Sequence, residues 1–240
     1  MKIALCLSGH LRLYDGVYEF WKENLLDLHE VDVYMHLWDQ LGINNSVNIP
    51  NSSGVTDILP IDIEQVEKIW APKAIVVEEY SKFHPLFETR ANIWLQTRDK
   101  FNLPDYDRPL ANFSMYYKWW ACNQLINQDC SYDLVIRSRP DVILGKPLPE
   151  EIFDEPTLLY TPEDGSWSGV SDLITIAPPT IMDQWCNIWP LLDRKYVQAV
   201  DNKRFETCLH PHFMFVQHIS DLKIPHKVLP INGYITRINY

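Results

Sequence analysis

Residues 133 to 144, Asp-Leu-Val-Ile-Arg-Ser-Arg-Pro-Asp-Val-Ile-Leu, constrain the fold more than any other part of the chain. A short apolar run, residues 134 to 136, leads directly into two arginines, a proline and an aspartate. The run is too short to indicate a helix and is rich in β-branched residues, so it predicts a central strand of a parallel sheet. Pro140 cannot donate a hydrogen bond to a sheet and is expected to end that strand.

The polar residues that follow this strand are candidates for a ligand site. Ligands of open α/β sheets bind at the carboxyl ends of strands, where Arg137, Arg139 and Asp141 are expected to project. Guanidinium groups match phosphate oxygens, and a carboxylate can hold a divalent cation that bridges a diphosphate. The alternative is a structural cluster of salt bridges, because buried arginines are commonly paired with carboxylates.

Ser8, Gly9, His10 and Arg12 form a second polar motif, directly after an apolar run that predicts the first strand. Between a strand and a helix, Gly9 would let the backbone approach a nucleotide, free amides at the helix start would attract its phosphates, and Arg12 would add charge. The alternative is an ordinary turn, since neither a GxGxxG motif nor a P-loop lysine is present. The pairing with the arginine strand favours the nucleotide site.

Together, Ser8-Gly-His-Leu-Arg12 and Arg137-Ser-Arg-Pro-Asp141 resemble motifs of small GT-A-type glycosyltransferases from bacterial polysaccharide clusters and viruses. In that family a first strand ends in Ser-Gly-x-x-Arg, and a later strand ends in Arg-x-Arg-x-Asp. Other GT-A enzymes carry Asp-x-Asp there, and Arg139 occupies the position of the first aspartate. The resemblance implies a nucleotide-sugar donor, a glycan or other hydroxyl acceptor, and a role in polysaccharide biosynthesis.

The resemblance also suggests a Mn²⁺ or Mg²⁺ ion on Asp141. Some GT-A enzymes place a late histidine on the metal, and His212 is the candidate in this chain. Because a lone histidine pair, here His210 and His212, is more often part of a surface or core, that alternative stays open. Arg139 in place of the usual aspartate leaves open a second version, in which arginines bind the diphosphate without a metal.

The acceptor side is expected in the polar stretch from residue 161 to residue 172. Trp167 could stack on a sugar ring, and Asp172 could take a hydroxyl proton as general base. The resemblance also implies that an aspartate at the start of the following strand, here Asp172, faces the acceptor. Glu206 is a second candidate catalytic carboxylate. The alternatives are a strand cap for Asp172, a packed Trp167 and a solvated helix residue for Glu206.

Composition limits the function classes. A chain of 240 residues with 46% hydrophobic residues predicts one folded domain spanning residues 1 to 240. The net charge of −11 argues against nucleic-acid binding, which needs a basic surface, so any phosphate site must be a local arginine pocket. No apolar stretch approaches the ~20 residues of a membrane span. Five cysteines without a CxxC pair suggest a reduced, cytoplasmic protein.

Strand and helix patterns alternate along the chain, which predicts an α/β fold: a GT-A-like, Rossmann-like, parallel-rich mixed sheet flanked by helices. A helix over residues 181 to 192 is expected to kink at Pro190. Residues 40 to 60 are expected to form a long loop. Strands are expected at residues 31–37, 74–77, 134–136, 158–160, 173–177 and 224–229.

These patterns favour a glycosyltransferase that uses a nucleotide-diphosphate sugar. Two other classes remain open. A sulfotransferase-like enzyme would also need arginines, but the sequence near Gly9 lacks the serine and lysine of a P-loop-like element. A catalytically inactive nucleotide- or carbohydrate-binding module would carry the same binding residues without turnover.

Overall fold

The structure is a computed structural model of the chain. Expected features at residues 42–59, Trp167, Glu206 and His210 lie outside the described residues. The described residues are 1–12, 14–41, 60–101, 109–126, 131–163, 170–202 and 211–235.

The centre of the fold is a seven-stranded mixed sheet with the strand order β3-β2-β1-β4-β7-β6-β8. Only β7 runs antiparallel to its neighbours β4 and β6, and the other pairings in this sheet are parallel. The parallel-rich α/β class expected from the sequence is therefore confirmed. The strands are β1 (Lys2–Leu11), β2 (Glu30–Leu41), β3 (Ala74–Glu78), β4 (Leu134–Ser138), β6 (Leu159–Pro162), β7 (Ile174–Ala177) and β8 (His226–Leu229).

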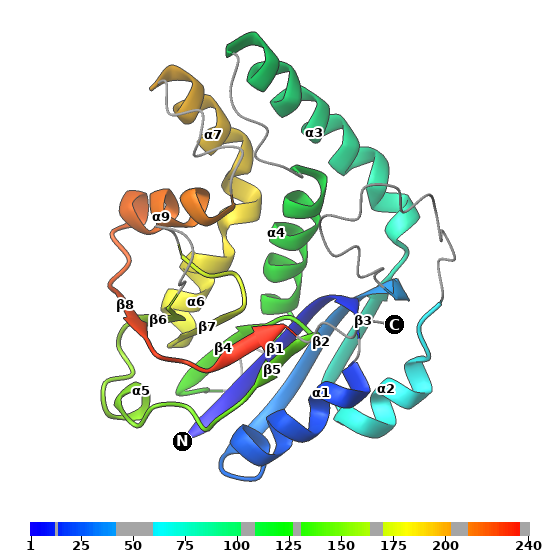
Figure 1. Ribbon diagram of the computed structural model, residues 1–240, viewed down its shortest axis with the longest axis vertical. Coiled ribbons are helices and arrows are strands. Elements are labelled where there is room, and N and C mark those ends of the chain that lie inside the picture. Colours follow the sequence, from blue (N-terminus) through cyan, green and yellow to red (C-terminus); the bar gives the residue numbers. More distant parts are fainter. Residues whose placement is uncertain are drawn as a thin grey trace.

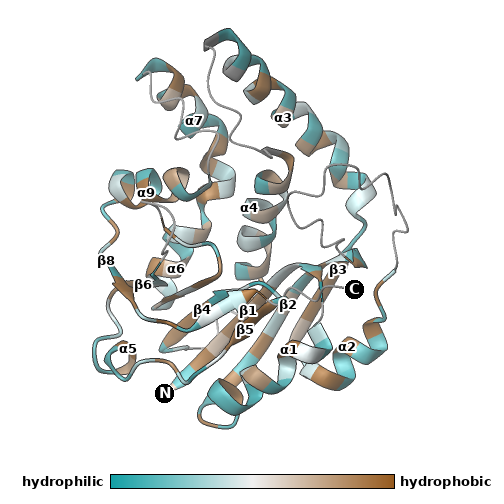
Figure 2. Cartoon of the chain, in the orientation of Figure 1, coloured by the Kyte–Doolittle hydropathy of each residue, from teal (hydrophilic) through white to brown (hydrophobic). Residues whose placement is uncertain are grey.

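Helices cover both faces of the sheet (Figure 1). One face packs against α3 (Tyr80–Phe101), α4 (Pro109–Asn123), α6 (Pro179–Cys186), α7 (Ile188–Asp201) and α9 (Pro211–Leu222). The other face packs against α1 (Tyr14–Trp21), the π-helical turn η1 (Lys22–Leu26), α2 (Ile63–Trp70), α5 (Glu151–Asp154) and a two-stranded sheet of β5 (Val142–Leu144) and β9 (Gly233–Ile235). The hydropathy colouring in Figure 2 shows apolar strands between more polar helices, as burial of a central sheet requires.

Strand β4 lies in the middle of the sheet, between β1 and β7, and all five of its residues are buried. This confirms the central strand expected at residues 134 to 136. Strands β1 and β4 are parallel neighbours, with Leu5 opposite Ile136 and Leu7 opposite Ser138. Their carboxyl ends therefore meet at one edge of the sheet, and the two polar motifs follow from there.

Two element boundaries differ from the sequence-based expectation. Strand β1 continues through Ser8, Gly9 and His10 to Leu11, because β2 is long enough to pair with it beyond Leu7. Gly9 has a φ of 116° at an irregularity in that pairing, a conformation that favours glycine. These residues therefore line a strand end and do not form a strand-to-helix turn.

The second difference concerns the helix expected over residues 181 to 192. It is two helices, α6 and α7, separated at Asn187. Pro190 lies in the first turn of α7, where its missing N–H leaves no intrahelical hydrogen bond unmade. The proline thus fits a helix start, and the kink expected at Pro190 is replaced by a break three residues earlier.

Because two histidines are buried, we expect acid to destabilise the fold. Burial lowers the pKa of both His36 and His218 from 6.5 to about 4, so the folded protein keeps them neutral. The unfolded chain binds more protons between these values, and we expect the free energy of unfolding to fall as the pH drops from 6.5 toward 4. The measurement is urea unfolding across this range. His218→Gln should show a shallower dependence on pH, and an unchanged slope would contradict the assignment.

Candidate functional site

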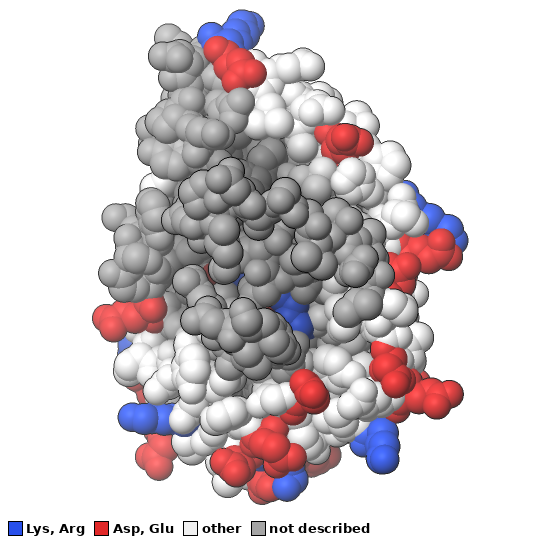
Figure 3. Space-filling model, turned by 45° about the vertical axis from the view of Figure 1, so that its right-hand side comes forward, with Lys and Arg blue, Asp and Glu red and all other residues white. Residues whose placement is uncertain are grey.

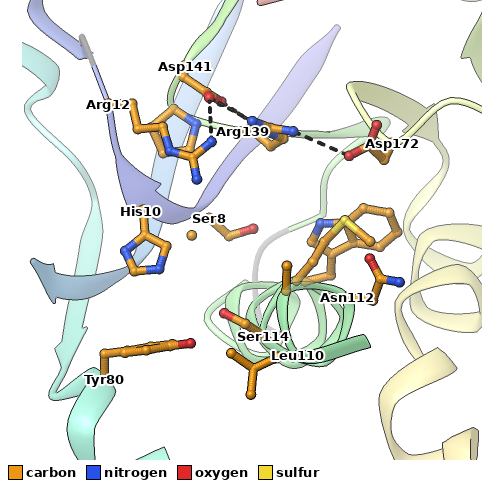
Figure 4. Close-up of a pocket in the computed structure, with 15 residues that line it drawn as sticks. Ser8, His10, Arg12, Tyr80, Leu110, Asn112, Ser114, Arg139, Asp141 and Asp172 are labelled. Atoms are coloured by element: carbon orange, nitrogen blue, oxygen red, sulfur yellow. Dashed lines mark hydrogen bonds and ion pairs between the residues drawn. The ribbon is translucent and has the colours of Figure 1, made fainter. Parts of the chain in front are cut away.

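A cavity of about 340 Å³ opens at the edge where β1 and β4 end. Its walls come from the end of β1, the start of α3, one side of α4, the residues after β4 and the residue range before β7. It collects most of the site residues expected from the sequence, namely Ser8, Gly9, His10, Arg12, Arg139, Asp141 and Asp172. In Figure 4, the two arginines and Asp141 lie opposite α4, with His10 and Tyr80 toward one end and Asp172 toward the other.

Asp141 is held by two guanidinium groups. Arg139 donates from Nε to Asp141 Oδ1 at 2.9 Å and from Nη2 to Oδ2 at 2.7 Å. Arg12 donates from Nη1 to Oδ2 at 3.4 Å. Burial alone would lower the pKa of Arg139. The neighbouring carboxylates of Asp141 and Asp172 outweigh this effect and raise the pKa of Arg139 above its ordinary value. The guanidinium fork of Arg139 is thus fixed in orientation at the cavity wall.

Asp172 lies on the other side of the same arginine. Arg139 Nη1 is 3.4 Å from Asp172 Oδ2, and His212 Nε2 is 3.9 Å from Asp172 Oδ1. Burial alone would raise the pKa of Asp172, but the charges of Arg139, His212 and Arg137 outweigh it, and the pKa is lowered. Asp172 is therefore an ionised carboxylate at neutral pH. It lines the cavity, at the site where the sequence led us to expect it.

The charges that line the cavity balance. Arg12 and Arg139 contribute two positive charges, and Asp141 and Asp172 contribute two negative ones. Burial lowers the pKa of His10 to about 4, so this residue is neutral at pH 7. An anionic ligand would therefore have to share the arginines with the carboxylates that now hold them.

The end of the cavity near His10 is aromatic. The rings of His10 and Tyr80 are 5.2 Å apart, and those of His10 and Trp38 are 6.3 Å apart. His10 Nδ1 lies 3.2 Å from the carbonyl oxygen of Gln40, which can only accept, so Nδ1 carries the proton. The other ring nitrogen of the neutral imidazole is then an acceptor.

The expectation that Arg137 projects into the site is wrong for the cavity described here. Arg137 is 1% exposed and does not line it. It lies within β4, opposite Cys6 of β1, and belongs to the face that α4 covers. Its guanidinium carbon is 3.5 Å from the ring centroid of Trp119, and Nη2 donates to the carbonyl oxygens of Asp172 and Leu173. Arg139 reaches the cavity because it follows the strand end.

The predicted metal ligands do not fit a metal site. Asp141 and His212 are not brought together, because His212 contacts Asp172, and Arg139 lies between Asp141 and Asp172. Two guanidinium groups already occupy the oxygens of Asp141, and their charge opposes a divalent cation there. Within the described residues, no group of three or more His, Cys, Asp or Glu side chains is placed to hold a metal ion.

Sequence reasoning missed the wall that α3 and α4 contribute. Tyr80, Asn112, Ser114 and Trp119 all line the cavity, and Trp119 is also part of the buried core. Ser114 accepts a hydrogen bond from Trp38 Nε1 at 2.9 Å. Asn112 and Ser114 in the first half of a largely apolar helix were the available signal. Nothing in the sequence shows which side of that helix faces a cavity.

Comparisons with known proteins add little to this geometry. No family model matches the chain, and no curated protein matches it. Among solved structures, the chain is similar to mouse xyloside xylosyltransferase 1 in its apo form, with 9% sequence identity and a TM-score of 0.46. The alignment covers 95% of this chain and 85% of that one. At this level the likeness carries no argument about function.

None of the described helices is both long and apolar enough to cross a membrane. Figure 3 shows acidic and basic side chains mixed over the described part of one face, with no broad basic field. This mixture on one face agrees with the acidic net charge of the chain.

Proposed function

We propose that this protein is a glycosyltransferase that moves a sugar from a nucleotide-diphosphate donor to a hydroxyl group of a glycan or another acceptor. The observation that supports it best is one cavity that combines two arginines with the carboxylate of Asp172. The Ser-Gly-x-x-Arg and Arg-x-Arg-x-Asp motifs supply Arg12 and Arg139 to this cavity. Resemblance in sequence and placement in space therefore point to the same residues.

The donor is proposed to bind in one orientation. Its diphosphate would lie on Arg12 and Arg139, whose N–H groups match phosphate oxygens. Its base would lie toward the aromatic end at His10 and Tyr80, where a planar ring can stack. The sugar and the acceptor would then meet at Asp172, at the opposite end.

Sugar transfer needs a stabilised leaving group, a base for the acceptor hydroxyl, and a donor and acceptor held in the right relative orientation. The acceptor oxygen bonds to the anomeric carbon, and the bond from that carbon to the diphosphate oxygen breaks with its electron pair leaving on the diphosphate. Arg12 and Arg139 stabilise this growing charge, and Asp172 takes the hydroxyl proton. The lowered pKa of Asp172 keeps it ionised and ready to accept, although it also makes the carboxylate a weaker base.

Arginines, without a metal on Asp141, are proposed to hold the diphosphate. Asp141→Asn removes a negative charge that now competes for Arg12 and Arg139. We therefore expect the variant to bind nucleotide diphosphates in EDTA as tightly as the wild type or more tightly, by calorimetry. If Asp141 instead held a required Mg²⁺ or Mn²⁺, binding would need the metal in the wild type and would weaken in Asp141→Asn.

A ligand screen tests the proposed function first. Thermal unfolding is followed with UDP-, GDP- and dTDP-sugars, and with a CMP-sugar, which has a single phosphate, as the comparison; each is tested with and without Mn²⁺. A ligand at 100 times its Kd stabilises the fold by about 2.7 kcal/mol, which a thermal shift resolves. We expect one base to be preferred and its nucleoside, which lacks phosphate, to give a smaller shift. No shift with any nucleotide would contradict the proposal.

One observation favours the alternative of a binding module without turnover. The carboxylate of Asp172 is paired with Arg139, which lowers its basicity. A binding module would show the same preference for one nucleotide but would leave the bound donor intact. Release of free sugar from the donor distinguishes the two functions, since a transferase loses some sugar to water.

A further inference from the structure

Arg137 is a buried charged residue that the proposed mechanism leaves unused. We propose that Arg137 is a positioning residue, an inference that rests on the proposed function. It would fix the shape of the acceptor end of the cavity by holding the backbone at Asp172 and one face of the Trp119 ring. The guanidinium contacts both walls of that end without touching the ligand space itself. Its role would thus differ from that of Arg139, two residues further along the chain.

The first wall is the backbone that carries Asp172. Arg137 Nη2 donates to the carbonyl oxygen of Asp172 and, at 3.3 Å, to that of Leu173. Ser138 Oγ donates to the same Leu173 carbonyl oxygen at 3.0 Å. Two buried side chains of β4 therefore fix the two peptide groups that directly follow Asp172. This matters because catalysis is sensitive to displacements of about 1 Å.

The second wall is α4. The guanidinium carbon of Arg137 lies 3.5 Å from the ring centroid of Trp119, within cation–π range, and the indole lines the cavity. Trp119 in turn stacks on Phe215 and Trp185, with ring centroids 4.9 and 6.0 Å away. The orientation of the indole is therefore set from both the sheet and the helices behind it.

Burial of this arginine needs an explanation beyond stability. Arg137 is 1% exposed, forms no ion pair within the described part of the chain, and its Nε and Nη1 atoms have no hydrogen-bond partner there. A well-packed apolar side chain at such a position is often neutral or stabilising. The stability of the fold therefore does not explain a charged side chain at this position. A role in holding Asp172 and Trp119 in place does explain it.

The experiment separates donor binding from transfer in two variants. Arg137→Met keeps the volume and removes the hydrogen bonds, and Ser138→Ala removes the second donor with little change in volume. We expect both to keep nucleotide Kd within threefold of the wild type by calorimetry. The transfer or donor-hydrolysis kcat should fall at least tenfold in Arg137→Met and by a smaller factor in Ser138→Ala. Lys195→Met, which removes a buried lysine paired with Asp221, is the control for destabilisation and should leave kcat unchanged.

A pH profile adds a readout that lost packing would not move. The groups whose positive charge can stabilise the Asp172 carboxylate are Arg139, Arg137 and, when it is protonated, His212. Loss of the Arg137 charge removes one of the three that stabilise its carboxylate, so the acid limb of kcat should move to higher pH in Arg137→Met and stay in place in Ser138→Ala.

The outcomes are distinct. The positioning role would be overturned if folded Arg137→Met kept the kcat and the pH profile of the wild type and Ser138→Ala kept its kcat. The proposed function would stay intact in that case. A loss of nucleotide affinity in Arg137→Met as large as in Arg139→Ala would overturn it as well, in favour of direct phosphate binding. If Arg137→Met does not fold, an unchanged kcat in Ser138→Ala decides against the role. A wild type that neither binds nor hydrolyses any donor would refute the proposed function itself.

Discussion

Asp172→Asn is expected to lower the transfer rate by about 100-fold or more, because general-base catalysis contributes about 10²- to 10⁴-fold and the amide cannot take the hydroxyl proton. Nucleotide affinity should stay near wild type or tighten slightly, since the change removes a carboxylate that competes for Arg139. The measurement is steady-state transfer, or donor hydrolysis, beside calorimetric titration of the nucleotide. The effect is thus confined to the chemical step.

The control for this variant is Asp193→Asn, which changes an exposed aspartate on α7 that pairs with Arg90. It should match the wild type in both measurements. A transfer rate in Asp172→Asn close to that of the wild type would rule out Asp172 as the base. A large loss of nucleotide affinity would instead place Asp172 in donor binding.

Arg139→Ala is expected to weaken nucleotide binding at least tenfold. A hydrogen bond to a charged group contributes about 1.5 to 3 kcal/mol, and about 1.4 kcal/mol corresponds to a factor of ten. Arg137→Met serves as the matched control, since Arg137 is close in the chain but does not line the cavity. Equal nucleotide affinity in a folded Arg139→Ala variant would remove the main support for a phosphate site.

The central part of the fold could be predicted because its signals are local. The apolar run before Arg137 is β-branched and short, and β4 is indeed the fully buried strand beside β1. The rule that ligands collect at the carboxyl ends of strands then placed Arg139 and Asp141 at one cavity with Arg12. These steps need only the periodicity of the chain and the direction of its strands.

The direction of individual side chains could not be predicted in the same way. Strand β4 extends two residues beyond the apolar run, which places Arg137 inside the sheet and leaves Arg139 outside it. A shift of one residue at a strand end reverses the face to which a side chain points. Likewise, the pairing of His212 with Asp172 depends on how α9 packs near β7, and no local pattern encodes that packing.

The most direct test of the central claim is the rate at which the wild type releases free sugar from nucleotide-diphosphate sugars, compared with Arg139→Ala and Asp172→Asn at donor concentrations above and below Kd. The account predicts hydrolysis of at least one donor above its spontaneous rate. A higher donor concentration should recover part of the rate in Arg139→Ala, because it overcomes the weaker binding but not the lost stabilisation of the leaving diphosphate. Asp172→Asn should stay slow at saturating donor. A wild type that binds a donor and never releases sugar, or binds none, would contradict the assignment as a glycosyltransferase.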